Sequence, residues 1–266
     1  MRSVQLLHLT DPHLFADETC ELYDVNTADS FQAVLDSALG GQARPDIILV
    51  TGDIAEDESR DAYLNFRRAL ARFDGPVLCA PGNHDSPETM APVLTGNGFQ
   101  YCGAAEIGGW NIVVLSSHVR RDPSGRVARD ELERLDVSLA GRPTLPALIA
   151  VHHPPVSVHS RWLDGVGLAN SAELMRIVER HPQVKGILSG HVHQETDVMH
   201  GGVRVLTTPS TCAQFLPRSE ACVMDQRPPA WRHVELQPGG ALVSSVTWLN
   251  GWRASKPVRD TRQGPF

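Results

Sequence analysis

The feature that most constrains this chain is an alternation of short apolar runs with amphipathic stretches, which continues until His191. The apolar runs have strand length and occupy residues 4–10, 46–51, 77–80, 111–117, 147–151 and 185–189. Between them, apolar side chains recur at helical spacing, and we predict helices at residues 27–39, 59–73, 129–140 and 171–180. Because alternating strands and helices form right-handed crossover units, this part of the chain predicts a largely parallel sheet with helices outside it.

The pattern changes after His193. Residues 197–199 and 203–207 flank a His-Gly-Gly turn, and residues 231–236 and 241–249 flank a Pro-Gly-Gly turn, so both pairs are predicted to form hairpins. An α/β chain that ends in hairpins indicates two mixed sheets packed face to face with helices on both outer sides. We expect one domain over residues 1–252, followed by a loosely ordered tail at residues 253–266, which lacks periodicity.

The composition narrows the classes of partner. Of the 266 residues, 41% are hydrophobic and 21% are charged, which excludes a disordered chain, a collagen-like repeat and a membrane channel. A net charge of −7 provides no overall basic field for long nucleic acids. The five cysteines form no C-x-x-C pair, which argues against a disulfide framework and a cysteine zinc site. The sequence also shows neither a signal-peptide pattern nor an apolar run of 18 residues. We therefore predict a cytoplasmic protein with no membrane partner, and the oligomeric state stays open, a homodimer included.

Polar segments follow five of the predicted strands. These segments are residues 11–13 (Asp-Pro-His), 52–53 (Gly-Asp), 82–85 (Gly-Asn-His-Asp), 152–154 (His-His-Pro) and 190–193 (Gly-His-Val-His). The carboxyl ends of parallel strands meet at one edge of a sheet, so these segments should converge there. In an extended chain residues i and i+2 face the same side, which would let Asp11 act with His13 and His191 with His193.

The residue types in these segments are metal ligands. The candidates are Asp11, His13, Asp53, Asn83, His152, His191 and His193. We prefer His152 to His153 because it directly ends its strand, whereas alternation turns the next side chain to the opposite face. A set of carboxylates, imidazoles and an amide without a thiolate suits Fe, Mn or Zn. It is too large for one tetrahedral site, but it can hold two ions if Asp53 bridges them, as in two-metal phosphatases and nucleases.

The ordered set D-x-H, G-D, G-N-H-D, H-H-P and G-H-x-H resembles the calcineurin-like metallophosphoesterase superfamily. Residues 209–215 and 229–232 are similar to its bacterial class III cyclic-AMP phosphodiesterase branch. The resemblance implies a four-layer sandwich with a dinuclear site at the carboxyl edge of its strands. It implies one metal bound by Asp11, His13, Asp53 and His193. The other metal would be bound by Asp53, Asn83, His152 and His191, with His84 beside the scissile phosphate.

These expectations lead to a mechanism for phosphodiester hydrolysis. Two cations, Fe or Mn for preference and Zn as an alternative, would lower the pKa of a shared water so that hydroxide attacks phosphorus. The catalytic residues would be Asp53 as bridge, Asn83 for charge on the equatorial oxygens, and His84 for departure of the ester oxygen. Cyclic AMP, yielding 5′-AMP, is the expected small-molecule substrate on the strength of the resemblance.

Two alternatives remain at this point. The first is a phosphodiesterase for other diesters, such as 2′,3′-cyclic nucleotides or glycerophosphodiesters; the second is a metal-binding regulatory module without turnover. For the substrate, Asn170 could contact phosphate or cap the helix that follows it. Phe215 could stack on a purine or simply pack in the interior.

Overall fold

Two six-stranded mixed sheets form the centre of the computed structural model, which describes residues 2–41 and 44–252. The first sheet has the order β16 (Leu242–Trp248), β15 (Ala230–Leu236), β1 (Val4–Leu9), β4 (Ile47–Thr51), β5 (Val77–Ala80) and β6 (Phe99–Tyr101). The second has the order β11 (Thr196–His200), β12 (Val203–Thr207), β10 (Val184–Ser189), β9 (Ala147–Ala150), β8 (Trp110–Val114) and β7 (Gly103–Ile107). The two mixed sheets predicted from the sequence are thus confirmed.

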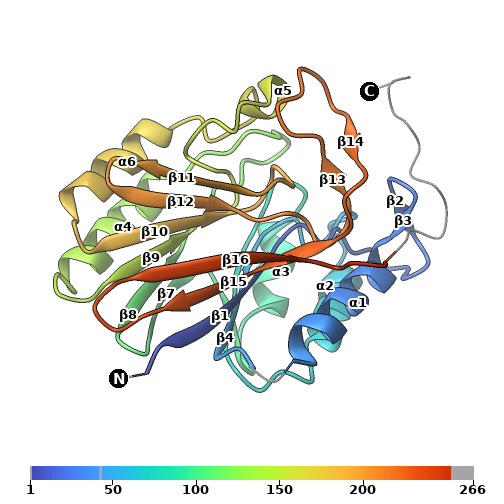
Figure 1. Cartoon of the computed structure of the whole chain (residues 1–266), viewed down its shortest axis with the longest axis horizontal. Coiled ribbons are helices and arrows are strands. Elements are labelled where there is room, and N and C mark those ends of the chain that lie inside the picture. The colour runs from blue at the N-terminus through green and yellow to red at the C-terminus, as the bar shows by residue number, and fades with distance from the viewer. Residues whose placement is uncertain (1, 42–43, 253–266) are drawn as a thin grey trace.

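In the first sheet the parallel pairs extend from β1 to the β6 edge, and the antiparallel pairs lie at the other edge. In the second sheet the parallel pairs lie in the middle, with an antiparallel pair at each edge. Strands β1, β4, β5 and β6 are parallel, as are β8, β9, β10 and β12. The predicted hairpins are present as β11 with β12 and β15 with β16, and both add antiparallel strands. Strand β15 pairs with β1, so a strand from the last part of the described chain lies beside the first strand (Figure 1).

Helices cover both outer faces, as expected. Helices α1 (Thr27–Leu39), α2 (Arg60–Ala69) and α3 (Pro87–Val93) pack on the first sheet. Helices α4 (Arg129–Ala140) and α6 (Ser171–Arg180) pack on the second, at the opposite side of the molecule (Figure 1). The sequence analysis missed α3, the one-turn helix α5 (Arg161–Asp164), β6 and β7, because such short elements carry little periodic signal.

Two short hairpins complete the description. They are β2 (Glu21–Leu22) with β3 (Val25–Asn26), and β13 (Gln214–Phe215) with β14 (Met224–Asp225). The tail predicted at residues 253–266 lies outside the described residues. Among the helices that are described, none has the length and apolar character needed to cross a bilayer.

The central strands are apolar on both faces because both faces are buried. On β4, Ile47 and Leu49 pack between the two sheets, whereas Ile48 and Val50 pack against the helices of the first sheet. This explains why the strands appear in the sequence as continuous apolar runs rather than as an alternation with polar residues. Burial on two sides fixes each strand firmly and therefore fixes the loops that follow the strand ends.

The layer between the sheets should dominate stability. Leu6 on β1 is 1% exposed there, whereas Leu216 is 43% exposed on the surface. We expect Leu6→Ala to lower the free energy of unfolding by about 2–5 kcal/mol, because it leaves a cavity in a packed core. Urea unfolding of both variants measures this, with Leu216→Ala as the matched control and an expected change below about 1 kcal/mol. Equal losses in the two variants would contradict this account of the core.

Candidate metal centre

The polar segments after the strands converge where the two sheets meet. Strands β1, β4 and β5 of the first sheet lead into Asp11, Asp53 and Asn83, and strands β9 and β10 of the second lead into His152 and His191. Backbone hydrogen bonds hold the first two loops side by side, with the Asp11 amide donating to the Gly52 carbonyl at 3.0 Å. The predicted convergence at the carboxyl ends of the strands is what the structure shows.

The local backbone differs from the extended chain assumed in the sequence analysis. Asp11 (φ 52°), His13 (φ 48°), Asp53 (φ 48°), His191 (φ 68°) and His193 (φ 48°) all adopt positive φ values. The argument from strand alternation was therefore wrong in its reason, although the predicted pairs do converge. Left-handed residues other than glycine cost of order 1–3 kcal/mol each, and such strain is concentrated at functional sites. Gly52 (φ 97°) admits no side chain, since a Cβ would lie 2.5 Å from the Gly82 amide nitrogen.

A first cluster of donor atoms contains Asp11, His13, Asp53 and His193. The Nε2 atoms of His13 and His193 are 3.2 Å apart, and His193 Nε2 lies 3.4 Å from Asp11 Oδ1. His13 Nε2 lies 3.9 Å from Asp53 Oδ2. Donors bound to one ion at about 2.1 Å would lie roughly 3.0–3.5 Å from one another, so these spacings are close to those of a ligand set.

A second cluster shares Asp53 with the first. His152 Nε2 lies 3.3 Å from Asp53 Oδ2 and 3.1 Å from Asn83 Oδ1. His191 Nδ1 lies 2.9 Å from the same amide oxygen of Asn83. The same oxygen, Asp53 Oδ2, is thus the atom closest to donors of both clusters, which supports the bridging role expected for this residue.

The charges of the two clusters fit cations. Asp11 and Asp53 are 0% and 2% exposed, and their ion-pair partners among the described residues are histidines only. Burial opposes ionisation of Asp53, but His152 and His84 hold its pKa well below its usual value. Buried carboxylates require a compensating charge. Together with imidazole and amide donors, they fit divalent cations such as Fe, Mn or Zn.

Three imidazoles form hydrogen bonds through Nδ1, the nitrogen that points away from the clusters, so that Nε2 points toward them. The Nδ1 atom of His13 lies 2.7 Å from Glu56 Oε2. The Nδ1 atoms of His152 and His193 lie 2.6 Å and 2.7 Å from the carbonyl oxygens of Thr51 and Ala213. Such partners fix the tautomer and the ring orientation of metal-binding histidines. With Nδ1 engaged in this way, each ring directs its Nε2 toward the donor clusters.

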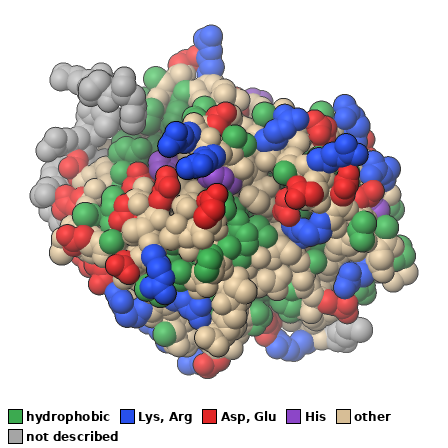
Figure 2. Space-filling model, turned by 180° about the vertical axis from the view of Figure 1, so that it is seen from behind, with side chains coloured by type: hydrophobic (Ala, Val, Ile, Leu, Met, Phe, Trp, Pro, Cys, Tyr) green, Lys and Arg blue, Asp and Glu red, His purple; other side chains and the backbone are tan. Residues whose placement is uncertain are grey.

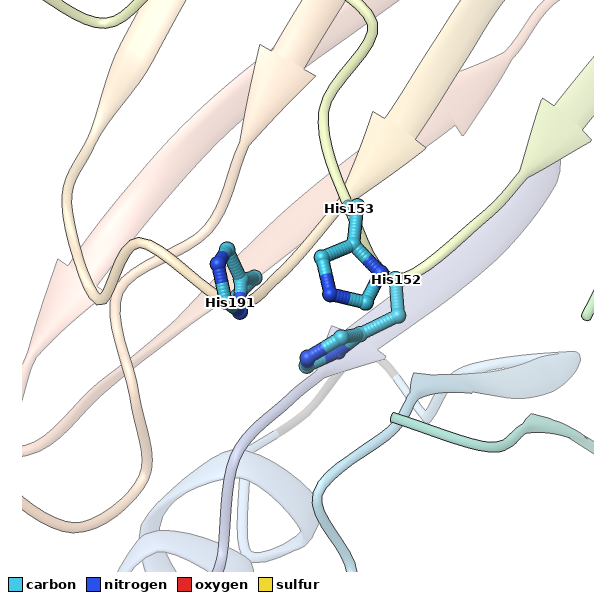
Figure 3. Close-up of side chains that lie close together, drawn as sticks. All are labelled: His152, His153 and His191. Atoms are coloured by element: carbon cyan, nitrogen blue, oxygen red, sulfur yellow. The ribbon is translucent and has the colours of Figure 1, made fainter. Parts of the chain in front are cut away.

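His153 lies closer to the site than the alternation argument predicted. Its ring centroid is 4.8 Å from that of His152 and 4.3 Å from that of His191 (Figure 3), so a position on the opposite face was wrong. Both of its nitrogens are engaged, however, Nδ1 with the Ser117 hydroxyl at 2.8 Å and Nε2 with the Pro123 carbonyl at 3.1 Å. Burial and the neighbouring His152 lower the pKa of His153 to about 3, which keeps the ring neutral. Because both nitrogens of His153 already have partners, His152 remains the ligand candidate.

His84 lies at the rim with its side chain 40% exposed. Its Nδ1 atom is 3.0 Å from Glu56 Oε2, and its backbone amide donates to Asp53 Oδ1 at 2.9 Å. Burial disfavours its protonated form, yet Asp53 and Glu56 raise its pKa to about 10. Cations at the clusters would offset the charge of Asp53 and lower this pKa. The arrangement leaves Nε2 of His84 as a proton donor that faces away from Glu56.

Two carboxylates that the sequence analysis did not single out, Glu56 and Asp85, support the clusters. Glu56 contacts both His13 and His84, and Asp85 is fully buried, where it accepts from the backbone amides of Ile54, Ala55 and Gly82. The signal that could have found them was their position, since Asp85 lies in the same polar segment as Asn83 and Glu56 lies three residues after Asp53. Asp85 braces the Asp53 loop against the Asn83 loop, and Glu56 connects a ligand with the rim.

The two predicted substrate contacts have different surroundings. Phe215 stacks on the ring of His193, with centroids 4.4 Å apart and an interplanar angle of 21°, and Trp162 meets it edge-on at 4.9 Å. The Asn170 side chain instead accepts from the Val127 amide and donates to the Val127 carbonyl. The structure therefore brings Phe215 to the first cluster, whereas the Asn170 amide connects the start of α6 to the loop that precedes α4.

Comparison with known proteins agrees with this geometry. The profile of the family described as "Calcineurin-like phosphoesterase" matches residues 4–195. The chain belongs to the calcineurin-like phosphoesterase family. It is 39% identical to "3',5'-cyclic adenosine monophosphate phosphodiesterase CpdA" of Escherichia coli K12 over 91% of this chain and 89% of the relative. It is 34% identical to "3',5'-cyclic-nucleotide phosphodiesterase alr5338" of Nostoc over 91% of each chain.

Solved structures share the fold at low sequence identity. A dimetal phosphatase from Danio rerio matches with a TM-score of 0.64 and 17% identity, over 92% of this chain and 99% of that chain. GAP50, titled "the anchor in the inner membrane complex of Plasmodium", also matches with a TM-score of 0.64, at 11% identity over 96% and 88% of the two chains. These likenesses establish the fold, and within it the chemistry depends on the side chains.

The bridging position of Asp53 can be tested directly. Asp53→Asn preserves the shape of the side chain but removes the negative charge between the two clusters. We expect the metal content to fall from about two ions per chain to one or fewer, and diester hydrolysis to fall by at least about 100-fold. Elemental analysis and a rate assay measure both effects, with the exposed Asp130→Asn as control. Two bound ions with wild-type turnover in Asp53→Asn would contradict the bridge.

Proposed function

We propose that the chain is a metal-dependent phosphodiesterase that hydrolyses 3′,5′-cyclic AMP to 5′-AMP. The observation that carries this proposal is the complete pair of donor clusters sharing Asp53, with His84 at their rim. Relatives named as cyclic AMP phosphodiesterases, at 35–39% identity over more than nine-tenths of the chain, support the choice of substrate. The complete ligand set also argues against a regulatory module without turnover.

The division of chemistry follows from the contacts. When bound, two cations supply Lewis-acid charge and a strong nucleophile at neutral pH; Fe or Mn is our first choice and Zn is the alternative. Asn83 lies between His152 and His191, where its amide can face the equatorial oxygens of the phosphate. Glu56 binds Nδ1 of His84, so the opposite nitrogen can hold the proton that the departing 3′-oxygen receives as its bond to phosphorus breaks.

The charges on one face of the molecule favour a small substrate over a long nucleic acid. Acidic and basic side chains of the described residues are interspersed on the face shown in Figure 2, which offers no continuous basic track for a nucleic-acid backbone on that side. Phe215 remains a predicted contact for the base because it borders His193. The proposal for Asn170 is weaker, since Val127 already binds both ends of its amide. A cytoplasmic location and a homodimer remain predictions from the sequence.

The substrate is tested with purified protein loaded with Mn²⁺ or Fe²⁺. We expect release of 5′-AMP from 3′,5′-cyclic AMP, with slower hydrolysis of 2′,3′-cyclic AMP, glycerophosphocholine and bis(p-nitrophenyl) phosphate. Chromatography of the products together with metal analysis of the same sample measures this. Hydrolysis of the other diesters without cyclic AMP would favour the first alternative, and two bound ions without any turnover would favour the regulatory module.

The role of His84 predicts a dependence on the leaving group. His84→Ala should slow hydrolysis of cyclic AMP by about 10²–10⁴-fold, because the departing alkoxide needs a proton. Hydrolysis of bis(p-nitrophenyl) phosphate should fall much less, since p-nitrophenolate leaves without protonation. The ratio of the two rates separates proton donation from a general loss of activity. Equal losses on both substrates with an unchanged metal content would show that His84 does not protonate the leaving oxygen.

A further inference from the structure

A chain of buried hydrogen bonds runs from the metal-ligand candidate Asp11 into the interior between the sheets. All of its members are at most 2% exposed. In order they are Asp11, Thr10, Thr51, His8, Thr208 and Arg232. Successive atoms are 2.6, 2.9, 2.8, 2.7 and 3.1 Å apart, so every step is within hydrogen-bonding distance.

The members come from both sheets. His8 lies on β1 and Arg232 lies opposite it on β15, while Thr51 ends β4 in the same sheet (Figure 1). Thr208 directly follows β12 of the second sheet, and its hydroxyl lies between the His8 ring and the Arg232 guanidinium. The chain therefore depends on the packing of the two sheets and not on any local sequence segment.

The direction of each hydrogen bond is determined from the Asp11 end. A carboxylate only accepts, so the Thr10 hydroxyl donates to Asp11 Oδ2 and must itself accept from the Thr51 hydroxyl. Thr51 then accepts from an N–H at Nε2 of His8. Burial and the charge of Arg232 lower the pKa of His8 to about 3, so the ring is neutral and its Nδ1 is a bare acceptor.

At the Arg232 end the hydrogen bonds have the same direction. Nδ1 of His8 accepts from the Thr208 hydroxyl, and Thr208 accepts from Nε of Arg232. The remaining guanidinium N–H groups donate to the carbonyls of Thr207 and Thr196 and to the Ser244 hydroxyl, and no described carboxylate lies within ion-pair distance of this arginine. Every donor thus points from a buried cation toward a buried anion, and bonds aligned in this way strengthen one another.

These buried hydrogen bonds also reach the second cluster. The hydroxyl of Thr51 is a member of the hydrogen-bond chain, and the carbonyl of Thr51 lies 2.6 Å from Nδ1 of His152. At Asp11 the Thr10 hydroxyl donates to Oδ2, whereas Oδ1 lies 3.4 Å from Nε2 of His193 in the first cluster. One carboxylate oxygen is therefore fixed by the protein and the other is directed toward the donors.

We propose that Arg232, Thr208, His8, Thr51 and Thr10 form a polarised relay that positions the Asp11 carboxylate and strengthens its binding of metal. This inference rests on the proposed metal centre and adds positioning residues to it, since none of the five lies in a donor cluster. Its distinctive consequence is action at a distance: Thr208, which contacts neither cluster, should influence the affinity of the metal site through three intervening side chains.

The test measures Mn²⁺ affinity by titration, with the EPR signal of free Mn²⁺ as readout. Thr208→Val and Thr10→Val each remove one hydroxyl with little change of shape, and Thr10→Ser retains it. We expect both valine variants to bind Mn²⁺ about 10- to 100-fold more weakly and Thr10→Ser to stay close to wild type. Thr196→Val is the matched control: the Thr196 hydroxyl pairs with Thr207, and the contact of Thr196 with Arg232 runs through its backbone carbonyl, which valine retains.

A defect confined to Thr10→Val, with Thr208→Val no different from Thr196→Val, would overturn the relay and leave only a local contact. Thermal unfolding of each variant shows whether it is folded. If a valine variant does not fold, the tautomer of His8 decides the matter in the wild-type protein, read from long-range ¹H–¹⁵N NMR correlations with and without Zn²⁺. A proton on Nε2 is the expected result, and a proton on Nδ1 would reverse the donors and overturn the proposal.

These readouts are independent of turnover. Protein that hydrolyses no diester but shows the weaker Mn²⁺ binding of Thr208→Val would refute the proposed function and keep the relay. Wild-type protein that binds no Mn²⁺ would refute the metal centre and, with it, the effect of the relay on affinity. Hydrolysis of cyclic AMP with equal Mn²⁺ affinity in wild type and Thr208→Val would keep the function and refute the relay.

Discussion

Two buried carboxylates that form no ion pair with any described arginine or lysine govern the organisation of this site. Asp11 and Asp53 lie at most 2% exposed among histidines, and a charge in such surroundings costs far more than it does in water. Cations bound in the two clusters would remove that cost. The imidazoles are already oriented toward the clusters by hydrogen bonds with carbonyl and carboxylate oxygens. Metal binding and the stability of the strand ends are therefore expected to be coupled.

The fold brings this charge to one place and supplies its support. The ligand candidates come from the carboxyl ends of strands in both sheets, so neither sheet alone contains a complete cluster. The support continues behind the ligands, through Glu56 on one side and through the buried hydrogen bonds toward Arg232 on the other. A fold shared with proteins as different as a dimetal phosphatase and an anchor of a membrane complex does not itself specify hydrolysis. In this chain the specification comes from the side chains at the strand ends.

Much of the site could be predicted because metal binding leaves its mark on residue type and order. The ligand candidates follow strands whose apolar runs are unmistakable, and the sheets did bring them together. The left-handed conformation of residues such as Asp11 could not be foreseen, since it results from loops pinned against each other by tertiary hydrogen bonds. For the same reason alternation misplaced His153, whose ring turns toward His191 once the chain leaves the strand.

The sequence by itself determined the layers, the strand ends and the candidate metal donors, because periodic burial and ligand chemistry are local properties of the chain. Only the tertiary structure decided which oxygen of Asp53 faces both clusters, that Glu56 joins His13 to His84, and that Thr208 lies between His8 and Arg232. These relations join residues that are far apart in the sequence, and hydrogen bonds between such residues depend on distances that exist only when the two sheets have packed.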